Sequence, residues 1–168
     1  MMLYNLMEST VNLCFESIID KIKDENVPYN EVIPELKTLW IDLNYKDVFD
    51  VSSSFNSCKK RTTELINNVI GIERKKLMSF TDTKTSWSIT GGDIDAARIN
   101  QLCKSFGVKC QIPKEISEKA SVLKTIKEKR NNLAHGDFSF EYIGRDITID
   151  DLDDWKNEVT SYLSYFIQ

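Results

Sequence analysis

Residues 114–136, KEISEKASVLKTIKEKRNNLAHG, combine a helical hydrophobic pattern with the only histidine of the chain. Their apolar side chains recur at intervals of three, four or seven residues, which is the spacing of one face of a helix. We therefore expect a helix from about Lys114 to Ala134, with Gly136 ending it just after His135. Its inward face would carry Ile116, Ala120, Leu123, Ile126 and Leu133.

The same period predicts helices on both sides of this stretch. Residues 3–25, 57–76 and 93–106 each carry an apolar stripe, and residues 30–43 carry another behind Asn30, a residue that can cap a helix. Residues 148–166 form the last expected helix, where Thr148 and Asp151 are spaced as in a capping box. The sequence therefore predicts helices along nearly the whole chain.

The segments between these stripes have the composition of loops. Residues 52–56 are rich in serine and asparagine, and residues 81–92 are polar and end in two glycines. Asp93 can cap the helix that follows. Residues 138–142 alternate apolar and polar side chains, which favours a short extended stretch or hairpin.

The composition fits one helical domain. The chain has 168 residues, of which 41% are hydrophobic and 29% charged, so it can bury a core of ordinary size. Only six glycines and three prolines are present, too few for the many tight turns of a small all-β fold. We expect an all-α, up-and-down bundle of five or six helices in a single domain, residues 1–168.

Several classes of protein are disfavoured. No run approaches the roughly 20 apolar residues of a membrane span, and the N-terminus lacks the basic region of a signal peptide. The four cysteines form no C-x-x-C pair, and one histidine makes a zinc site improbable. We expect a cytoplasmic protein with reduced thiols, no metal, no cofactor and no membrane association.

The net charge of −4 means that contact with nucleic acid would need a local basic patch. Residues 114–130 hold six basic and three acidic side chains, whereas residues 137–158 hold eight acidic and two basic ones. On charge alone, a solvated helix face is the favoured explanation of both runs. If RNA binds, the basic candidates are Lys124, Lys127 and Lys129.

Arg130, Asn131 and His135 are the candidates for catalysis. On an ideal helix Asn131 and His135 lie about 40° apart, and Arg130 lies about 140° from His135 but is long enough to reach the same site. Imidazole titrates near neutrality and guanidinium is a fixed fork for phosphate, so the set suits phosphodiester cleavage. A histidine at a helix end is also often only a capping or packing residue.

The segment Arg130-Asn-Asn-Leu-Ala-His135 resembles the R-x4-6-H signature of HEPN domains. Other segments are similar to the MAE-type HEPN subfamily: residues 4–11 to its early helix, residues 92–99 to its "G-N-hydrophobic-D" helix start, and residues 133–140 and 144–148 to the block after its active-site helix. The likeness covers nearly the whole chain. It implies a HEPN-like helical bundle.

The resemblance also implies a metal-independent endoribonuclease of prokaryotic defence or toxin–antitoxin type, acting on tRNA or another RNA. His135 would be the general acid or base, Arg130 would stabilise charge on phosphorus, and Asn131 would orient His135 or the phosphate. Attack by the ribose 2′-hydroxyl would leave a 2′,3′-cyclic phosphate. The family implies a homodimer with a composite active site, and an antitoxin or other protein partner fits the same biology.

A non-catalytic HEPN module for dimerisation, partner binding or RNA binding is the main alternative. The acidic run of residues 137–158 favours it, because such a surface suits a basic partner. Burial or wide separation of Arg130 and His135 would support this alternative. A catalytic role for the carboxylates of residues 150–154 is a weaker hypothesis, since acids in a first helical turn already complement the helix dipole.

Overall fold

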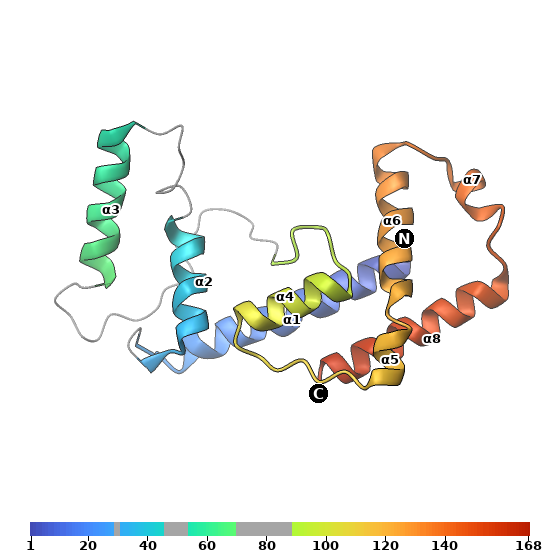
Figure 1. Cartoon of the computed structure of the whole chain (residues 1–168), viewed down its shortest axis with the longest axis horizontal. Coiled ribbons are helices and arrows are strands. Elements are labelled where there is room, and N and C mark those ends of the chain that lie inside the picture. Colours follow the sequence, from blue (N-terminus) through green and yellow to red (C-terminus); the bar gives the residue numbers. More distant parts are fainter. Residues whose placement is uncertain (29–30, 46–53, 70–88) are drawn as a thin grey trace. The chain divides into compact units, whose positions relative to one another are not determined.

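The computed structural model describes residues 1–28, 31–45, 54–69 and 89–168, and these residues form helices and connecting segments without a strand (Figure 1). The predicted all-α class is confirmed. Within these described residues, six helices have ten or more residues, in line with the predicted five or six, and two have only five. The elements are α1 (Met2–Asp24), α2 (Pro34–Tyr45), α3 (Phe55–Val69), α4 (Ala96–Ser105), α5 (Lys114–Glu118), α6 (Ser121–His135), α7 (Phe140–Gly144) and α8 (Ile149–Phe166).

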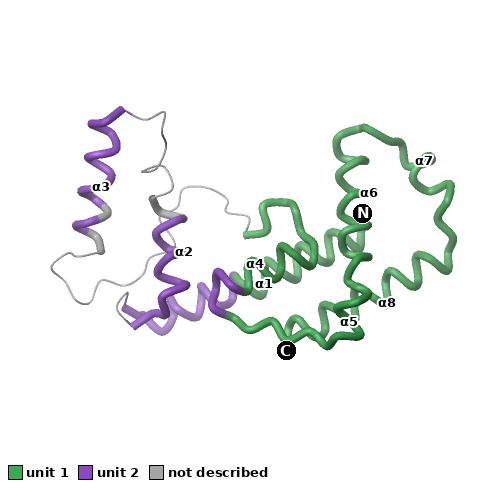
Figure 2. Tube along the Cα trace, viewed as in Figure 1, with its two compact units in different colours: residues 1–15, 88–103, 108–168 green, residues 16–87, 104–107 purple. Residues whose placement is uncertain are grey.

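The chain divides into two compact units, coloured separately in Figure 2. Unit 1 holds residues 1–15, 88–103 and 108–168, and unit 2 holds residues 16–87 and 104–107. The boundary lies inside α1, so this helix contributes its first half to one unit and its second half to the other. The expectation of one domain over residues 1–168 stays a prediction.

Unit 1 is built around the N-terminal half of α1. Its core consists of apolar side chains at helical intervals, and α8 packs against both α5 and α6. Phe15 and Phe166 meet within it, with ring centroids 5.9 Å apart. The buried side chains are Tyr4, Met7, Val11 and Phe15 of α1; Ile89 and Ile94; Ile99, Leu102 and Cys103 of α4; Ala120; Val122, Leu123 and Ile126 of α6; and Val159, Tyr162 and Leu163 of α8.

Unit 2 contains α2, α3 and the second half of α1. Its buried apolar side chains among the described residues are Ile19, Val32, Leu36 and Phe106. Gly107 has φ +67°, and a Cβ atom there would lie 2.4 Å from Cδ1 of Ile33. Glycine is therefore required at this turn, for its backbone conformation and for the close approach of Ile33.

Two helix starts were predicted with different success. The capping box of α8 is confirmed: the Thr148 side chain accepts from the backbone N–H of Asp151, and the Asp151 carboxylate accepts from the N–H of Thr148. The Thr148 hydroxyl also donates to this carboxylate (2.7 Å), and this bond, together with the one from the Thr148 N–H, holds the pKa of Asp151 below its ordinary value. The cap at Asp93 is wrong. Asp95 is the residue whose carboxylate accepts from the backbone N–H of Arg98 (2.9 Å), and α4 begins at Ala96.

The expected continuous helix over residues 114–134 is divided into α5 and α6. The N–H of Lys119 bonds to the carbonyl of Ile116, three residues back, and this tighter turn ends α5. The short extended stretch or hairpin expected at residues 138–142 is also wrong, because α7 begins at Phe140. The hydroxyl of Ser139 accepts from the N–H of Tyr142 (3.1 Å), which caps α7 and favours a helical turn over alternating strands.

The first and third expected helices agree with α1 and α3 in their described parts. Asn56, placed by its composition in a loop, lies inside α3. The predictions for Asn30, residues 52–53, residues 70–76 and residues 81–88 lie outside the described residues. None of the described helices is both long enough and apolar enough to cross a membrane.

Candidate active site

Helix α6 carries all three candidate catalytic residues at its C-terminal end. Gly136 follows in the left-handed conformation (φ +76°), and its N–H bonds to the carbonyl of Leu133 (3.3 Å), which closes the helix. His135 is exposed on the last turn, whereas Arg130 and Asn131 are half-buried. The prediction that Gly136 ends the helix directly after His135 is confirmed.

The Arg130 guanidinium is held by several groups in unit 1. Its Nη1 atom donates to Oδ1 of Asn131 (2.9 Å) and, more weakly, to the carbonyl oxygen of Gly92 (3.5 Å). Its Cζ atom lies 4.6 Å from the centroid of the Tyr4 ring, within the range of a cation–π contact. Asn131 therefore contacts Arg130, a neighbour that the helical geometry alone did not predict.

Tyr4 connects this arginine to the start of α1. The ring is fully buried, and its hydroxyl donates to the Gly92 carbonyl (2.6 Å) while accepting from the N–H of Ile94 (3.3 Å). Burial raises the pKa of Tyr4 above its ordinary value, which already lies well above neutrality, so the hydroxyl is protonated and can donate. The Gly92 carbonyl is thus shared by Tyr4 and Arg130.

The three lysines proposed as RNA contacts lie in different surroundings. The Lys127 side chain is only 17% exposed and pairs with the carboxylates of Asp95 (2.5 Å) and Asp93 (3.2 Å). Lys124 is exposed and pairs with Glu128 one turn away (3.7 Å). Lys129 lies over the Trp155 ring, with its Nζ atom 5.8 Å from the centroid. Lys124 and Lys129 are consequently the better placed for an external anion.

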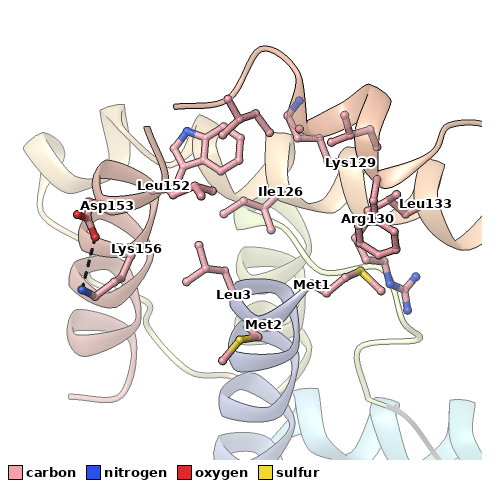
Figure 3. A pocket seen from close by; sticks show the side chains of 15 residues that line it. Met1, Met2, Leu3, Ile126, Lys129, Arg130, Leu133, Leu152, Asp153 and Lys156 are labelled. Atoms are coloured by element: carbon pink, nitrogen blue, oxygen red, sulfur yellow. Dashed lines mark ion pairs between the residues drawn. The ribbon is translucent and has the colours of Figure 1, made fainter. Parts of the chain in front are cut away.

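A groove of about 650 Å³ opens beside Arg130 (Figure 3). Its walls are mainly apolar, and Figure 3 shows Leu3, Ile126 and Leu152 around the space, with the Asp153–Lys156 ion pair (3.8 Å) on one side. Lys129 and Arg130 bring positive charge to its wall. The volume is in the range of small-molecule sites. The R-x4-H helix therefore combines basic groups with a large apolar surface.

The family model described as "HEPN_MAE_28990:/-like HEPN" matches residues 1–168, the whole chain. The chain belongs to this HEPN family. No curated protein matches it, and no solved structure does. Membership in a HEPN family indicates a nuclease or RNA-related role.

Metal binding by this HEPN chain was not expected from the sequence. The described part of the chain contains no cluster of three or more histidine, cysteine, aspartate or glutamate side chains suited to a metal ion. Metal independence stays a prediction for which activity in a chelator is the test.

Two neighbours of the site in this HEPN chain, Tyr4 and residues 92–95, were not expected from the sequence. Both lie in stretches that resemble the family, but resemblance alone gave them no role. The carboxylates of Asp93 and Asp95 precede Lys127 by more than 30 residues, so no local spacing links them. The only signal in the sequence is that two acidic residues, Asp93 and Asp95, stand just before α4.

The Asp95–Lys127 pair is expected to stabilise this HEPN chain. Asp95→Asn should lower the free energy of unfolding at pH 7 by about 2 kcal/mol, because it leaves a mostly buried ammonium without its closest partner. Asparagine can still cap α4, so the change isolates the charge. Denaturant unfolding measures the difference. Glu128→Gln, which removes an exposed partner of Lys124, should cost only a few tenths of a kcal/mol.

The pH dependence of this stabilisation has a defined direction. Burial would raise the pKa of Asp95, but the bonds from Lys127 and Arg98 outweigh it and lower the pKa below its ordinary value. The stabilisation is therefore complete above about pH 4, the unfolded value, and is lost as the pH falls through the lower folded value. The pKa of Lys127 is raised, chiefly by Asp95, so its contribution is lost only in strong base. An Asp95→Asn effect that stays constant below pH 4 would contradict this assignment.

Proposed function

We propose that this protein is a metal-independent endoribonuclease of the R-x4-H type, active in prokaryotic defence or as the toxin of a toxin–antitoxin pair, on tRNA or another cellular RNA. The observation that carries the proposal is the C-terminal end of α6. There an exposed imidazole, His135, follows a guanidinium, Arg130, whose position is defined by neighbouring groups. The non-catalytic alternative would favour burial of these two side chains, and neither of them is buried.

The proposed reaction uses Arg130, the ribose 2′-hydroxyl and two histidines, one from each of two chains. The 2′-hydroxyl oxygen bonds to phosphorus while a histidine takes its proton, and the bond from phosphorus to the 5′-oxygen breaks as a second histidine returns a proton to that oxygen. The products are a 2′,3′-cyclic phosphate and a 5′-hydroxyl. Arg130 stabilises the negative charge that develops on the phosphoryl oxygens. The need for a 2′-hydroxyl makes RNA and not DNA the substrate.

A homodimer with a composite site follows from the single histidine. One chain supplies one imidazole, so an acid and a base of this kind require two chains. The surface beside the motif also has the character of an interface: Met2 is 88% exposed and Phe140 is 70% exposed, and both line the groove next to Arg130. Exposed apolar surface of this kind is typical of sites where another protein docks.

The experiment is incubation of the purified protein with total RNA, with and without EDTA. Cleavage that persists in EDTA and leaves 2′,3′-cyclic phosphate ends supports the proposal, and cleavage abolished by EDTA overturns the metal-independent mechanism. An RNA carrying a 2′-deoxyribose at the cleaved position should resist cleavage. Binding of RNA without any cleavage would support the non-catalytic HEPN module.

The dimer can be tested through the exposed groove. Phe140→Glu should convert the protein to a monomer and abolish RNA cleavage, because it places a charge in the proposed apolar interface. Light scattering reports the mass. Phe55→Glu is the matched control, since Phe55 is similarly exposed (80%) on α3 of unit 2 and should leave the mass unchanged. An active monomer would refute the composite site.

A further inference from the structure

The Ile89–Asp95 segment is fastened to α1 and α6 by several contacts. Thr90 is buried; its N–H donates to Oδ1 of Asn12 (3.3 Å) and its hydroxyl donates to Oε1 of Glu8 (3.2 Å). Asp95 pairs with Lys127 of α6 (2.5 Å). Residues 92–95 of this segment begin the stretch that resembles the family's helix start, and they have no role in the proposed chemistry. The backbone of the segment is therefore fixed at the point where it passes Arg130.

The Tyr4 side chain completes the contacts around Arg130. Its hydroxyl donates to the Gly92 carbonyl (2.6 Å) and accepts from the Ile94 N–H (3.3 Å), so the side chain cannot leave its place beside Gly92 without breaking two bonds. The ring face lies against the guanidinium at 4.6 Å, and the Gly92 carbonyl contacts its Nη1 atom at 3.5 Å. Asn131 contacts the same nitrogen at 2.9 Å. The guanidinium is thus held by a ring face and two oxygens.

We propose that Tyr4, together with the Gly92 carbonyl, positions Arg130 for the reacting phosphate. The inference rests on the proposed ribonuclease function. Tyr4 is fully buried and touches no substrate, so it is a positioning residue. Both bonds, to Gly92 and to Asn131, come from Nη1, so the other three of the guanidinium's five N–H groups, on Nη2 and Nε, donate to neither residue. They supply the donors for phosphate, while the held Nη1 edge sets their direction.

The geometry can be tested without RNA, by NMR of the arginine Nε–Hε groups. A proton held over an aromatic face is shifted upfield by the ring current. In the wild-type protein, one of the five arginine signals should therefore lie upfield of the others, and Arg130→Lys should remove it. Tyr4→Leu should return that signal to the position of exposed arginines, whereas Tyr4→Phe should keep it. A wild-type spectrum without an upfield signal overturns the proposal, whether or not Tyr4→Leu folds.

Kinetics then test the consequence for cleavage. Tyr4→Leu should lower kcat by about tenfold to a hundredfold with little change in KM, since a displaced guanidinium loses contact mainly with the transition state. Tyr4→Phe should restore most of kcat, because the ring face remains. Tyr162→Phe is the control: it removes a hydroxyl from an equally buried tyrosine of α8 and should alter neither the Arg130 signal nor kcat.

The outcomes separate this inference from the proposed function. An upfield Arg130 signal in a protein that cleaves no RNA would retain the geometry but refute its catalytic purpose together with the ribonuclease proposal. Active protein in which a folded Tyr4→Leu variant keeps the wild-type kcat would refute the positioning role alone. A Tyr4→Leu variant with a higher KM but the wild-type kcat would also refute the positioning role.

Discussion

Replacing His135 by alanine is expected to lower the rate of RNA cleavage by about 10²- to 10⁴-fold, the usual contribution of a general acid or base. No other side chain of this chain is an imidazole, so no second histidine of the same chain can take over. His135 is exposed on the last turn of α6, and its removal should leave the fold and its stability nearly unchanged. Single-turnover cleavage of a defined RNA measures the effect.

Two further measurements make the His135 result specific. Added imidazole should restore part of the lost rate, because it can enter the space that the side chain leaves and carry protons. Asp137→Asn changes an exposed charge two residues away and should leave the rate unchanged. Cleavage by His135→Ala at the wild-type rate would eliminate this mechanism.

Replacing Arg130 by lysine is expected to lower kcat by about 10²- to 10³-fold although the positive charge is kept. Lysine is a point charge without the planar fork that binds two phosphoryl oxygens, and it cannot reproduce the contacts with Asn131 and the Tyr4 ring. Transition-state charge is what the fork stabilises, so kcat should fall more than KM rises.

Arg145→Lys provides the matched control for this substitution. Arg145 is exposed beyond the end of α7 and should tolerate lysine without loss of activity. Circular dichroism and thermal unfolding of both variants separate a catalytic loss from a loss of fold. Wild-type kcat in a folded Arg130→Lys protein would remove the guanidinium from the mechanism.

Local sequence patterns predicted the elements whose signals lie within a few residues of one another. The apolar stripe of α1, the capping box of Thr148 and Asp151, and the end of α6 at Gly136 are all confirmed. Each depends on backbone hydrogen bonds closed within one or two turns, which neighbouring residues determine. The prediction of an extended stretch or hairpin at residues 138–142 was wrong because a local hydrogen bond, the Ser139 cap of α7, outweighed a weak alternation of side chains.

The sequence by itself determined the helical class of this HEPN chain and the presence of Arg130, Asn131 and His135 on one helix end. Only the tertiary structure decided what surrounds them. Tyr4 and Gly92 reach Arg130 from 126 and 38 residues earlier in the chain, and Asp95 reaches Lys127 from 32 residues earlier. Such contacts arise when helices pack, because packing brings together side chains that no helical period relates.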